Sequence, residues 1–422
     1  MNYADAVRLL YSLGNEIKTT KLGLDRIERL LAELGSPHRA GRFVHVAGTN
    51  GKGSTCALIE SGLRAAGLRT GLYTSPHLVE PTERIRIDGA PVSTEYFAEA
   101  CLTVHEAAER LLSAGVLECH PTYFETVTAM AFVLFRRFRV DISVLEVGLG
   151  GRLDATNVVE PELAVITPVD FDHEAFLGKS LEAIASEKAG ILKRGAMALF
   201  APQRPEVAPI LAAHATAAGV VPVEASGWAI QDAELHALGN RFTVTGRQTL
   251  RIECPLAGEH QLTNAVTAVG ALELIGIRAE AIESGMRRAR WPGRLERIAQ
   301  HPDLFLDGAH NPAGARALAA YIRRFHAGRR VWLVYGAMRD KAVEEMAGIL
   351  APVAGRVILT APAQTRSVRP EILLESSDHP CARAAANLDE ALAMTREAEP
   401  GDVIFITGSL FLVGEARARF VQ

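Results

Sequence analysis

The segment with the clearest chemistry is a glycine-rich loop, GTNGKGS, at residues 48–54. Glycines let backbone N–H groups curve around phosphate oxygens, Lys52 adds a positive charge, and a helix beginning near Ser54 directs its positive end at the same place. The strict pattern G-x-x-x-x-G-K-[ST] is not met, since Val46 replaces its first glycine and Gly53 follows the lysine. We still predict a polyphosphate site here, in preference to an ordinary turn with a solvated lysine.

Acidic and imidazole side chains follow two further apolar runs. Glu146 ends VDISVLEV before a glycine-rich stretch, and Asp170, Asp172 and His173 come after ELAVITPV. In open parallel sheets, ligands bind beyond the carboxyl ends of the strands, so these side chains should face the phosphate loop. Mg²⁺ prefers oxygen ligands and enters with phosphates, which makes Glu146 the first metal candidate. The alternatives are that Glu146 caps a turn and that His173 closes a hydrogen-bond network.

The elements that must position these residues alternate between strand and helix, which predicts an α/β fold with a parallel sheet covered by helices. Residues 220–256 depart from this alternation and predict short strands of an antiparallel edge or subdomain. Elsewhere we expect strands at 43–47, 70–74, 140–147, 162–169, 197–201, 303–307, 330–336, 356–362 and 402–408, and helices at 54–66, 122–138, 180–193, 261–276 and 279–289.

The length of the chain and a breaker cluster predict two domains. A chain of 422 residues exceeds what one core usually supports. The cluster Trp291-Pro292-Gly293 precedes a new series of strands, so we place one domain at 1–292 and the other at 293–422.

Composition narrows the class of protein. The net charge of -4, from 45 basic and 49 acidic residues, gives no general field for a nucleic acid or an anionic membrane. Five cysteines without a C-x-x-C pair indicate neither a disulfide framework nor a cysteine zinc site, and favour a reducing cytoplasm. No run approaches the roughly 18 apolar residues of a membrane span, so we expect no membrane association.

Ten motifs together closely resemble the folylpolyglutamate synthase and dihydrofolate synthase family, a branch of the Mur ligase superfamily. They span nearly the whole chain, and their order and spacing make the resemblance specific. The motifs are GTNGKGS at 48–54, TSPHL at 74–78, TERIRI at 82–87, TYFE at 122–125, EVGLGGRLDATN at 146–157, SEKAGILK at 186–193, QLTNAVTA at 261–268, WPGRLE at 291–296, DGAHNP at 307–312 and GSLFLVGE at 408–415.

The resemblance implies an N-terminal P-loop ATPase domain, a C-terminal Rossmann-like domain, and ATP and substrates in a cleft between them. It also implies a ligase that phosphorylates a carboxylate and lets the glutamate amine attack the acyl phosphate. The acceptors would be dihydropteroate and reduced folates, and the chain a monomer. Such an intermediate must be kept from water, so we expect domain closure about a hinge at 291–293. Alternatives are a folylpolyglutamate synthase alone, a cell-wall Mur ligase, or an ATP-driven switch.

The same resemblance assigns roles to residues. It implies two Mg²⁺ ions, one held by Ser75 and Glu146 and the second partly by His173, and a catalytic Lys188 that becomes carbamylated. By helical spacing alone Lys188 would be a solvated lysine. The residues implied for ATP are Thr49, Asn50, Gly51, Lys52, Gly53, Ser54, Asn264, Arg294 and Asp307. Those implied for the folate or glutamate substrate are Thr122, Tyr123, Phe124, Glu125, Leu153, Asp154, Ala155 and His310.

Several of these positions have simpler interpretations. Asn264 could make a polar contact on its helix, Arg294 a linker salt bridge, and Asp307 with His310 a helix cap. The TYFE segment could be a buried helix start, because aromatic residues at helical spacing usually belong to the core.

Overall fold

A computed structural model describes residues 1–14 and 23–421 of the chain. They form two compact units, and the chain passes between them more than once. The first unit comprises Met1–Ala229, Val244–Leu250 and Asn264–Arg288; the second comprises Ile230–Thr243, Arg251–Thr263 and Ala289–Gln422. The predicted division at 292/293 stays a prediction about domain organisation.

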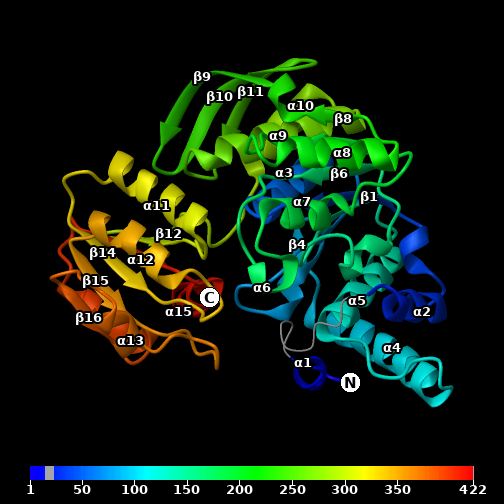
Figure 1. Ribbon diagram of the computed structural model, residues 1–422, viewed down its shortest axis with the longest axis horizontal. Helices are drawn as coiled ribbons and strands as arrows, with labels where there is room; N and C mark the ends of the chain where they lie inside the picture. The colour runs from blue at the N-terminus through cyan, green and yellow to red at the C-terminus, as the bar shows by residue number, and fades with distance from the viewer. Residues whose placement is uncertain (15–22, 422) are drawn as a thin grey trace. The chain divides into compact units, whose positions relative to one another are not determined.

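The first unit is built on an eight-stranded sheet of order β4-β3-β2-β5-β1-β6-β7-β8. Strands β1, β4, β6 and β8 of this sheet are labelled in Figure 1. The strands from β2 to β8 along this order pair in parallel, as expected for apolar runs buried on both faces. Their bounds are β1 Arg42–Ala47, β2 Thr70–Tyr73, β3 Ile85–Ile87, β4 Ala90–Pro91, β5 Ile142–Glu146, β6 Leu163–Ile166, β7 Met197–Phe200 and β8 Pro222–Glu224. The five strands predicted for this half are confirmed.

One edge of this sheet was not predicted. Strands β3 and β4 add to β2 in antiparallel fashion, which makes the sheet mixed. Asp88 and Gly89 join them with positive φ values of 51° and 81°, the backbone conformation that two-residue hairpin loops favour. An Asp-Gly pair is itself a hairpin signal, so the sequence contained this information.

Helices of the first unit cover the sheet and bring distant segments together. Helix α3 (Lys52–Ala65) packs on α10 (Ala279–Arg288), where a Cβ on Gly285 would come within 2.5 Å of the Gly62 Cα. Only glycine permits so close a contact. The remaining helices are α1 Tyr3–Ser12, α2 Asp25–Glu33, α4 Thr94–Ser113, α5 Tyr123–Arg137, α6 Glu174–Leu177, α7 Leu181–Ala189 and α8 Ala208–Ala218, with α9 His260–Ile275 contributing residues to both units.

The second unit contains a six-stranded sheet of order β12-β13-β17-β14-β15-β16, parallel except for the β12–β13 pair. Its strands are β12 Glu296–Ala299, β13 Asp303–Leu306, β14 Val331–Tyr335, β15 Arg356–Leu359, β16 Ala382–Ala384 and β17 Val403–Thr407. Its helices are α11 Pro312–Phe325, α12 Val343–Leu350, α13 Pro370–Glu375, α14 Leu388–Met394 and α15 Leu410–Phe420. The α/β class and the four strands predicted here are confirmed.

The unusual segment 220–256 contains a separate three-stranded sheet of order β11-β10-β9, whose residues are divided between the units. Its strands are β9 Ala229–His236, β10 Gly239–Thr245 and β11 Thr249–Cys254. The five cysteines are free thiols. Within the described residues, no helix has the length and apolar character needed to cross a membrane.

Candidate active site

The phosphate loop joins β1 to α3 through glycines that no other residue could replace without strain. Gly51 is the N-cap of α3 with φ 84°, and Gly48 has φ 146°. A Cβ on Gly48 would lie 1.9 Å from the Thr167 hydroxyl oxygen. The N–H groups of Thr49 and Asn50 donate to the Pro168 carbonyl oxygen at 3.0 and 3.2 Å, so they are used to hold the loop. The N–H groups at the start of a helix have no acceptor within that helix, so the first turn of α3 can direct them at a phosphate.

The side-chain amines of Lys52 and Lys188 both bind the backbone of this loop. Lys52 Nζ donates to the carbonyl oxygens of Gly48 and Thr49, both at 3.1 Å. Lys188, from α7, donates to the same Gly48 carbonyl oxygen at 2.8 Å. The arrangement places positive charge beside a helix N-terminus, which favours an anion.

Lys188 is buried and electrostatically perturbed. Burial and, to a smaller extent, the charge of Lys52 lower the pKa of its amine to about 7, against the opposing effect of Asp172 and Asp154. A large fraction of the amines is therefore neutral at pH 7. A solvated lysine on a helix face does not describe this residue, which is 4% exposed.

One small pocket collects the phosphate loop, the glycine-rich stretch after β5, the segment after β6, and α7. Its volume of about 10 Å³ admits a single water-sized group, so a phosphate would lie at its mouth. Of the four strand-end residues predicted to face the loop, Asp172 and His173 lie in this lining with Lys52 and Lys188, whereas Glu146 and Asp170 do not. The lining is Gly48, Thr49, Lys52, Val147, Gly148, Leu149, Gly150, Asp172, His173, Leu177 and Lys188.

Glu146 and Ser75 form a pair at the ends of β5 and β2. The Ser75 backbone N–H donates to Glu146 Oε2 at 3.2 Å, and Glu146 is 5% exposed. A buried carboxylate and the hydroxyl of a neighbouring serine are both oxygen donors, the type of ligand that Mg²⁺ prefers.

Asp154 organises the glycine-rich stretch after β5. Its Oδ2 accepts the N–H groups of Gly148 and Leu149 at 3.1 and 2.9 Å, and its Oδ1 accepts the Thr156 N–H at 3.0 Å. Burial raises the pKa of this carboxyl, and the hydrogen bonds oppose that increase. Ala155 packs in the hydrophobic core of the unit. These contacts give Asp154 and Ala155 a structural role beside the predicted one at the substrate.

The TYFE segment begins α5. Thr122 and Glu125 form a reciprocal capping box, and Arg26 donates to Glu125 Oε2 at 2.7 Å. The ring of Phe124 lies where a Cβ on Gly148 would come within 2.5 Å of it, so the segment adjoins the glycine-rich stretch. The buried-helix-start interpretation therefore holds for Glu125.

Tyr123 belongs to an aromatic and cationic cluster. It stacks on Tyr11 with ring centroids 5.8 Å apart, and the Arg84 guanidinium lies 5.1 Å from its ring centroid. Arg84 also donates to His77 Nδ1 at 2.8 Å. Sequence reasoning assigned no role to Arg26, Tyr11, His77 or Arg84. The signal for two of them existed, because His77 lies in TSPHL and Arg84 in TERIRI.

Asn264, the predicted nucleotide contact from α9, lies at the phosphate loop. A Cβ on Gly51 would come within 2.2 Å of Asn264 Oδ1. This amide therefore lies against the N-cap residue of α3, although it is distant in sequence.

Three predicted residues gather separately, in the second unit. Asp307 is buried and accepts the N–H groups of Leu295 and Ala309, both at 3.0 Å. Burial raises the pKa of its carboxyl, and the Arg294 charge opposes the increase. The Arg294 guanidinium covers Gly308, whose carbonyl oxygen accepts from His310 Nδ1 at 2.8 Å. Asp307 thus caps its own loop.

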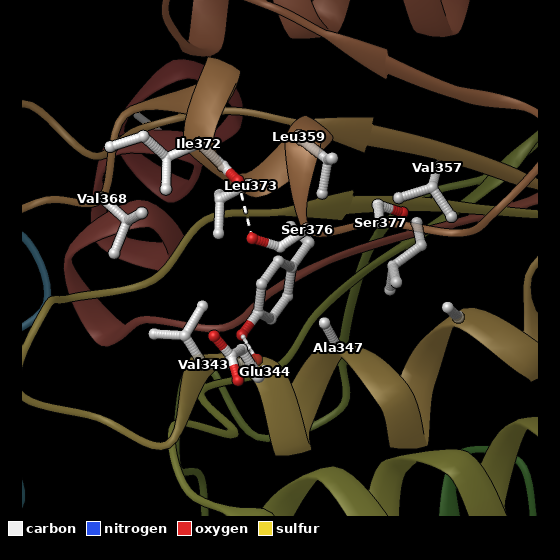
Figure 2. A pocket seen from close by; sticks show the side chains of 13 residues that line it. Val343, Glu344, Ala347, Val357, Leu359, Val368, Ile372, Leu373, Ser376 and Ser377 are labelled. Atoms are coloured by element: carbon white, nitrogen blue, oxygen red, sulfur yellow. Dashed lines mark hydrogen bonds between the residues drawn. The ribbon is translucent and has the colours of Figure 1, made fainter.

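A further cavity of about 130 Å³ lies in the second unit and contains none of the predicted residues. Figure 2 shows Val343, Glu344 and Ala347 of α12 on one side and Val368, Ile372 and Leu373 on the other. Its lining is mostly apolar, and we assign it no part in the site.

Two family models match the chain. The model described as the Mur ligase middle domain matches residues 46–272, and the model described as the Mur ligase, glutamate ligase domain matches residues 293–410. With the glycine loop and its lysines, these matches define the class of protein as a Mur ligase.

Relatives narrow the class. The dihydrofolate synthase/folylpolyglutamate synthase of Bacillus subtilis is 35% identical over 412 residues, which cover 94% of this chain and 95% of the relative. A Mycobacterium tuberculosis folylpolyglutamate synthase solved with ADP and AMPPCP superposes with a TM-score of 0.93 at 33% identity, over 100% of this chain and 99% of that one. The structure of E. coli FolC in complex with DHPP and ADP superposes with a TM-score of 0.89 at 31% identity, over 99% of this chain and 97% of that one. The chain belongs to the dihydrofolate synthase and folylpolyglutamate synthase group of the Mur ligase family.

Proposed function

We propose that this chain uses ATP to join L-glutamate to a folate-type carboxylate, with dihydropteroate and reduced folates both accepted. The observation that carries the proposal is the convergence of Lys52, Lys188 and His173 with the glycine loop on one pocket. Relatives of this group are named for both activities, and two solved neighbours hold ADP.

The first step transfers the γ-phosphoryl group of ATP to the carboxylate of the folate substrate. ADP leaves, and an acyl phosphate forms. The first-turn N–H groups of α3 and the Lys52 ammonium would stabilise negative charge on the phosphoryl oxygens, which is the main contribution a protein makes to this reaction. Phosphate is then displaced by the glutamate amine, which loses a proton as the amide forms.

Two Mg²⁺ ions fit the oxygen donors of the site. Ser75 and Glu146 would hold one, and His173, with Asp172 beside it, would help hold the other. His173 Nε2 lies 3.9 Å from Asp172 Oδ2, so one carboxylate accompanies the imidazole, a less usual Mg²⁺ ligand. When bound, the ions would neutralise negative charge on the phosphate groups of ATP.

Lys188 is proposed as a carbamate. A neutral amine can attack CO₂ and lose a proton, forming an N–C bond and a carboxylate. The lowered pKa of about 7 provides the neutral amine that this step requires. An anionic carbamate at Lys188 would also accommodate a cation beside the γ-phosphate.

The remaining assignments rest on the family motifs. Asn264, Arg294 and Asp307 are proposed to contact the nucleotide, and His310 the incoming glutamate. Thr122, Tyr123, Phe124 and Leu153 are proposed for the pterin, with Glu125, Asp154 and Ala155 acting through the helix start and the loop that they hold. We also propose a monomer in a reducing cytoplasm.

The test is glutamate-dependent ADP release with Mg²⁺, measured with dihydropteroate in one reaction and tetrahydrofolate in another. Turnover with both substrates is the expected result. Turnover with tetrahydrofolate alone would reduce the proposal to a folylpolyglutamate synthase. Turnover with neither, but with a nucleotide-linked cell-wall precursor, would assign the Mur-type activity instead.

A further inference from the structure

Two histidines and a glutamate come together at the C-terminal half of α4 and the segment that follows it. His105 and Glu109 are one helical turn apart on α4, and so project from the same face. His120 lies in the segment 114–122 that joins α4 to α5. One ligand atom from each of the three residues lies within 4.8 Å of the other two.

The separations suit a tetrahedral metal ion. His120 Nε2 lies 2.7 Å from Glu109 Oε1, and His105 Nδ1 lies 3.9 Å from the same oxygen. Tetrahedral bonds of roughly 2.0–2.2 Å place donor atoms roughly 3.4 Å apart, a value between these two distances. The imidazole rings of His105 and His120 are stacked, with centroids 5.6 Å apart.

The donor types select the kind of ion. Two imidazoles and one carboxylate are the ligand set of many zinc sites, and they leave a fourth position for water. Mg²⁺ and Ca²⁺ prefer oxygen ligands, so imidazole donors disfavour them. The three side chains are 28%, 51% and 33% exposed in the order His105, Glu109, His120, so an ion can enter and the chains can adjust.

We propose that His105, Glu109 and His120 form a binding site for one divalent transition-metal ion of the zinc class. The ion ties the segment before α5 to α4, and this segment ends at Thr122, the N-cap of α5. The site shares no residue with the magnesium positions proposed for catalysis. A simple His120–Glu109 hydrogen bond, with no metal affinity, is the competing interpretation.

The test uses the full chain, freed of metal with a chelator and titrated with Co²⁺ without nucleotide. Visible absorption reports tetrahedral Co²⁺, and Zn²⁺ should displace it. His105→Gln removes one ligand and leaves the His120–Glu109 contact intact, and Glu109→Gln gives a second variant. The matched control is His236→Gln, because His236 lies 3.6 Å from Glu234 in an exposed pair outside any three-ligand cluster found among the described residues.

We expect one tetrahedral Co²⁺ per chain in the wild type and in His236→Gln, with affinity at least roughly tenfold weaker in the other two variants. Zn²⁺ should raise the Tm of the wild type and of His236→Gln but not that of His105→Gln or Glu109→Gln. Mg²⁺ should raise the Tm of none of them. Equal binding by all four proteins, or no tetrahedral spectrum in the wild type, would overturn the proposal. Because no readout is ligase activity, the result is independent of the proposed function.

Discussion

Gly51 and Gly67 have nearly the same positive φ, 84° and 86°, but of the two only Gly51 lies against another side chain. This pair separates the cost of a left-handed backbone from the cost of crowding at the phosphate loop. Gly67→Ala should lose about 1–2 kcal/mol of stability from the backbone alone. Gly51→Ala should lose about 1–3 kcal/mol more, because its Cβ would lie 2.2 Å from Asn264 Oδ1.

Urea unfolding of the two glycine variants measures these losses, and ATP titration measures the effect on the loop. Gly51→Ala should bind ATP more weakly, whereas Gly67→Ala should bind it as the wild type does. Equal stability and equal ATP affinity in the two variants would show that the Asn264 contact does not constrain the loop.

Lys188 makes stability depend on pH. Its pKa is about 7 in the folded chain and about 10.4 when unfolded, so between these values the unfolded state binds more protons. Stability contributed by this residue therefore rises as pH increases from 7 to 10, by at most about 1.4 kcal/mol per pH unit. Below pH 7 both states are protonated and its contribution is constant.

The measurement compares the free energy of unfolding of the wild type with that of Lys188→Met in CO₂-free buffers across this range. The free energy of unfolding of the wild type should increase relative to that of the variant as pH rises. Ligase turnover should be lost in Lys188→Met. Lys179→Met, at an exposed lysine, should follow the wild type. Parallel curves for wild type and Lys188→Met would refute the lowered pKa.

At the scale of elements, the start of α5 depends on an ion pair with α2. Arg26 and Glu125 are 15% and 5% exposed, so Arg26→Met leaves a buried carboxylate without its cation. We expect Arg26→Met to lose about 3 kcal/mol of the free energy of unfolding, measured by urea unfolding. Arg42→Met, at the exposed pair with Glu162, should lose less than about 1 kcal/mol. Similar losses in both variants would show that burial does not strengthen the α5 contact.

For the whole molecule, the linker at 291–293 is predicted to act as a hinge. Gly293 has φ 72°, and its carbonyl oxygen accepts the Gly308 N–H at 2.8 Å. Gly293→Ala should reduce the freedom of this linker and lower turnover, with ATP affinity nearly unchanged, in coupled ADP-release and ATP-binding assays. Gly328→Ala, with φ 81° at an open position, controls for backbone strain. Unchanged turnover in Gly293→Ala would argue against a hinge here.

The sequence by itself determined the α/β class, the central strands of both sheets and the position of the phosphate loop. These features depend on local patterns: apolar runs, helical periodicity and glycines around Lys52, all read within a short window. The family motifs added the chemistry expected of Glu146 and Lys188. An Asp-Gly hairpin signal at Asp88 and Gly89 was also present locally.

Only the tertiary structure decided which distant side chains meet. Asn264 against Gly51, Arg26 on Glu125, and Lys188 on the Gly48 carbonyl oxygen all join segments far apart in the chain. The perturbed pKa of Lys188 likewise follows from its burial, which helical spacing did not reveal. Such contacts depend on how helices and strands pack, and packing is a property of the whole folded unit rather than of any short segment.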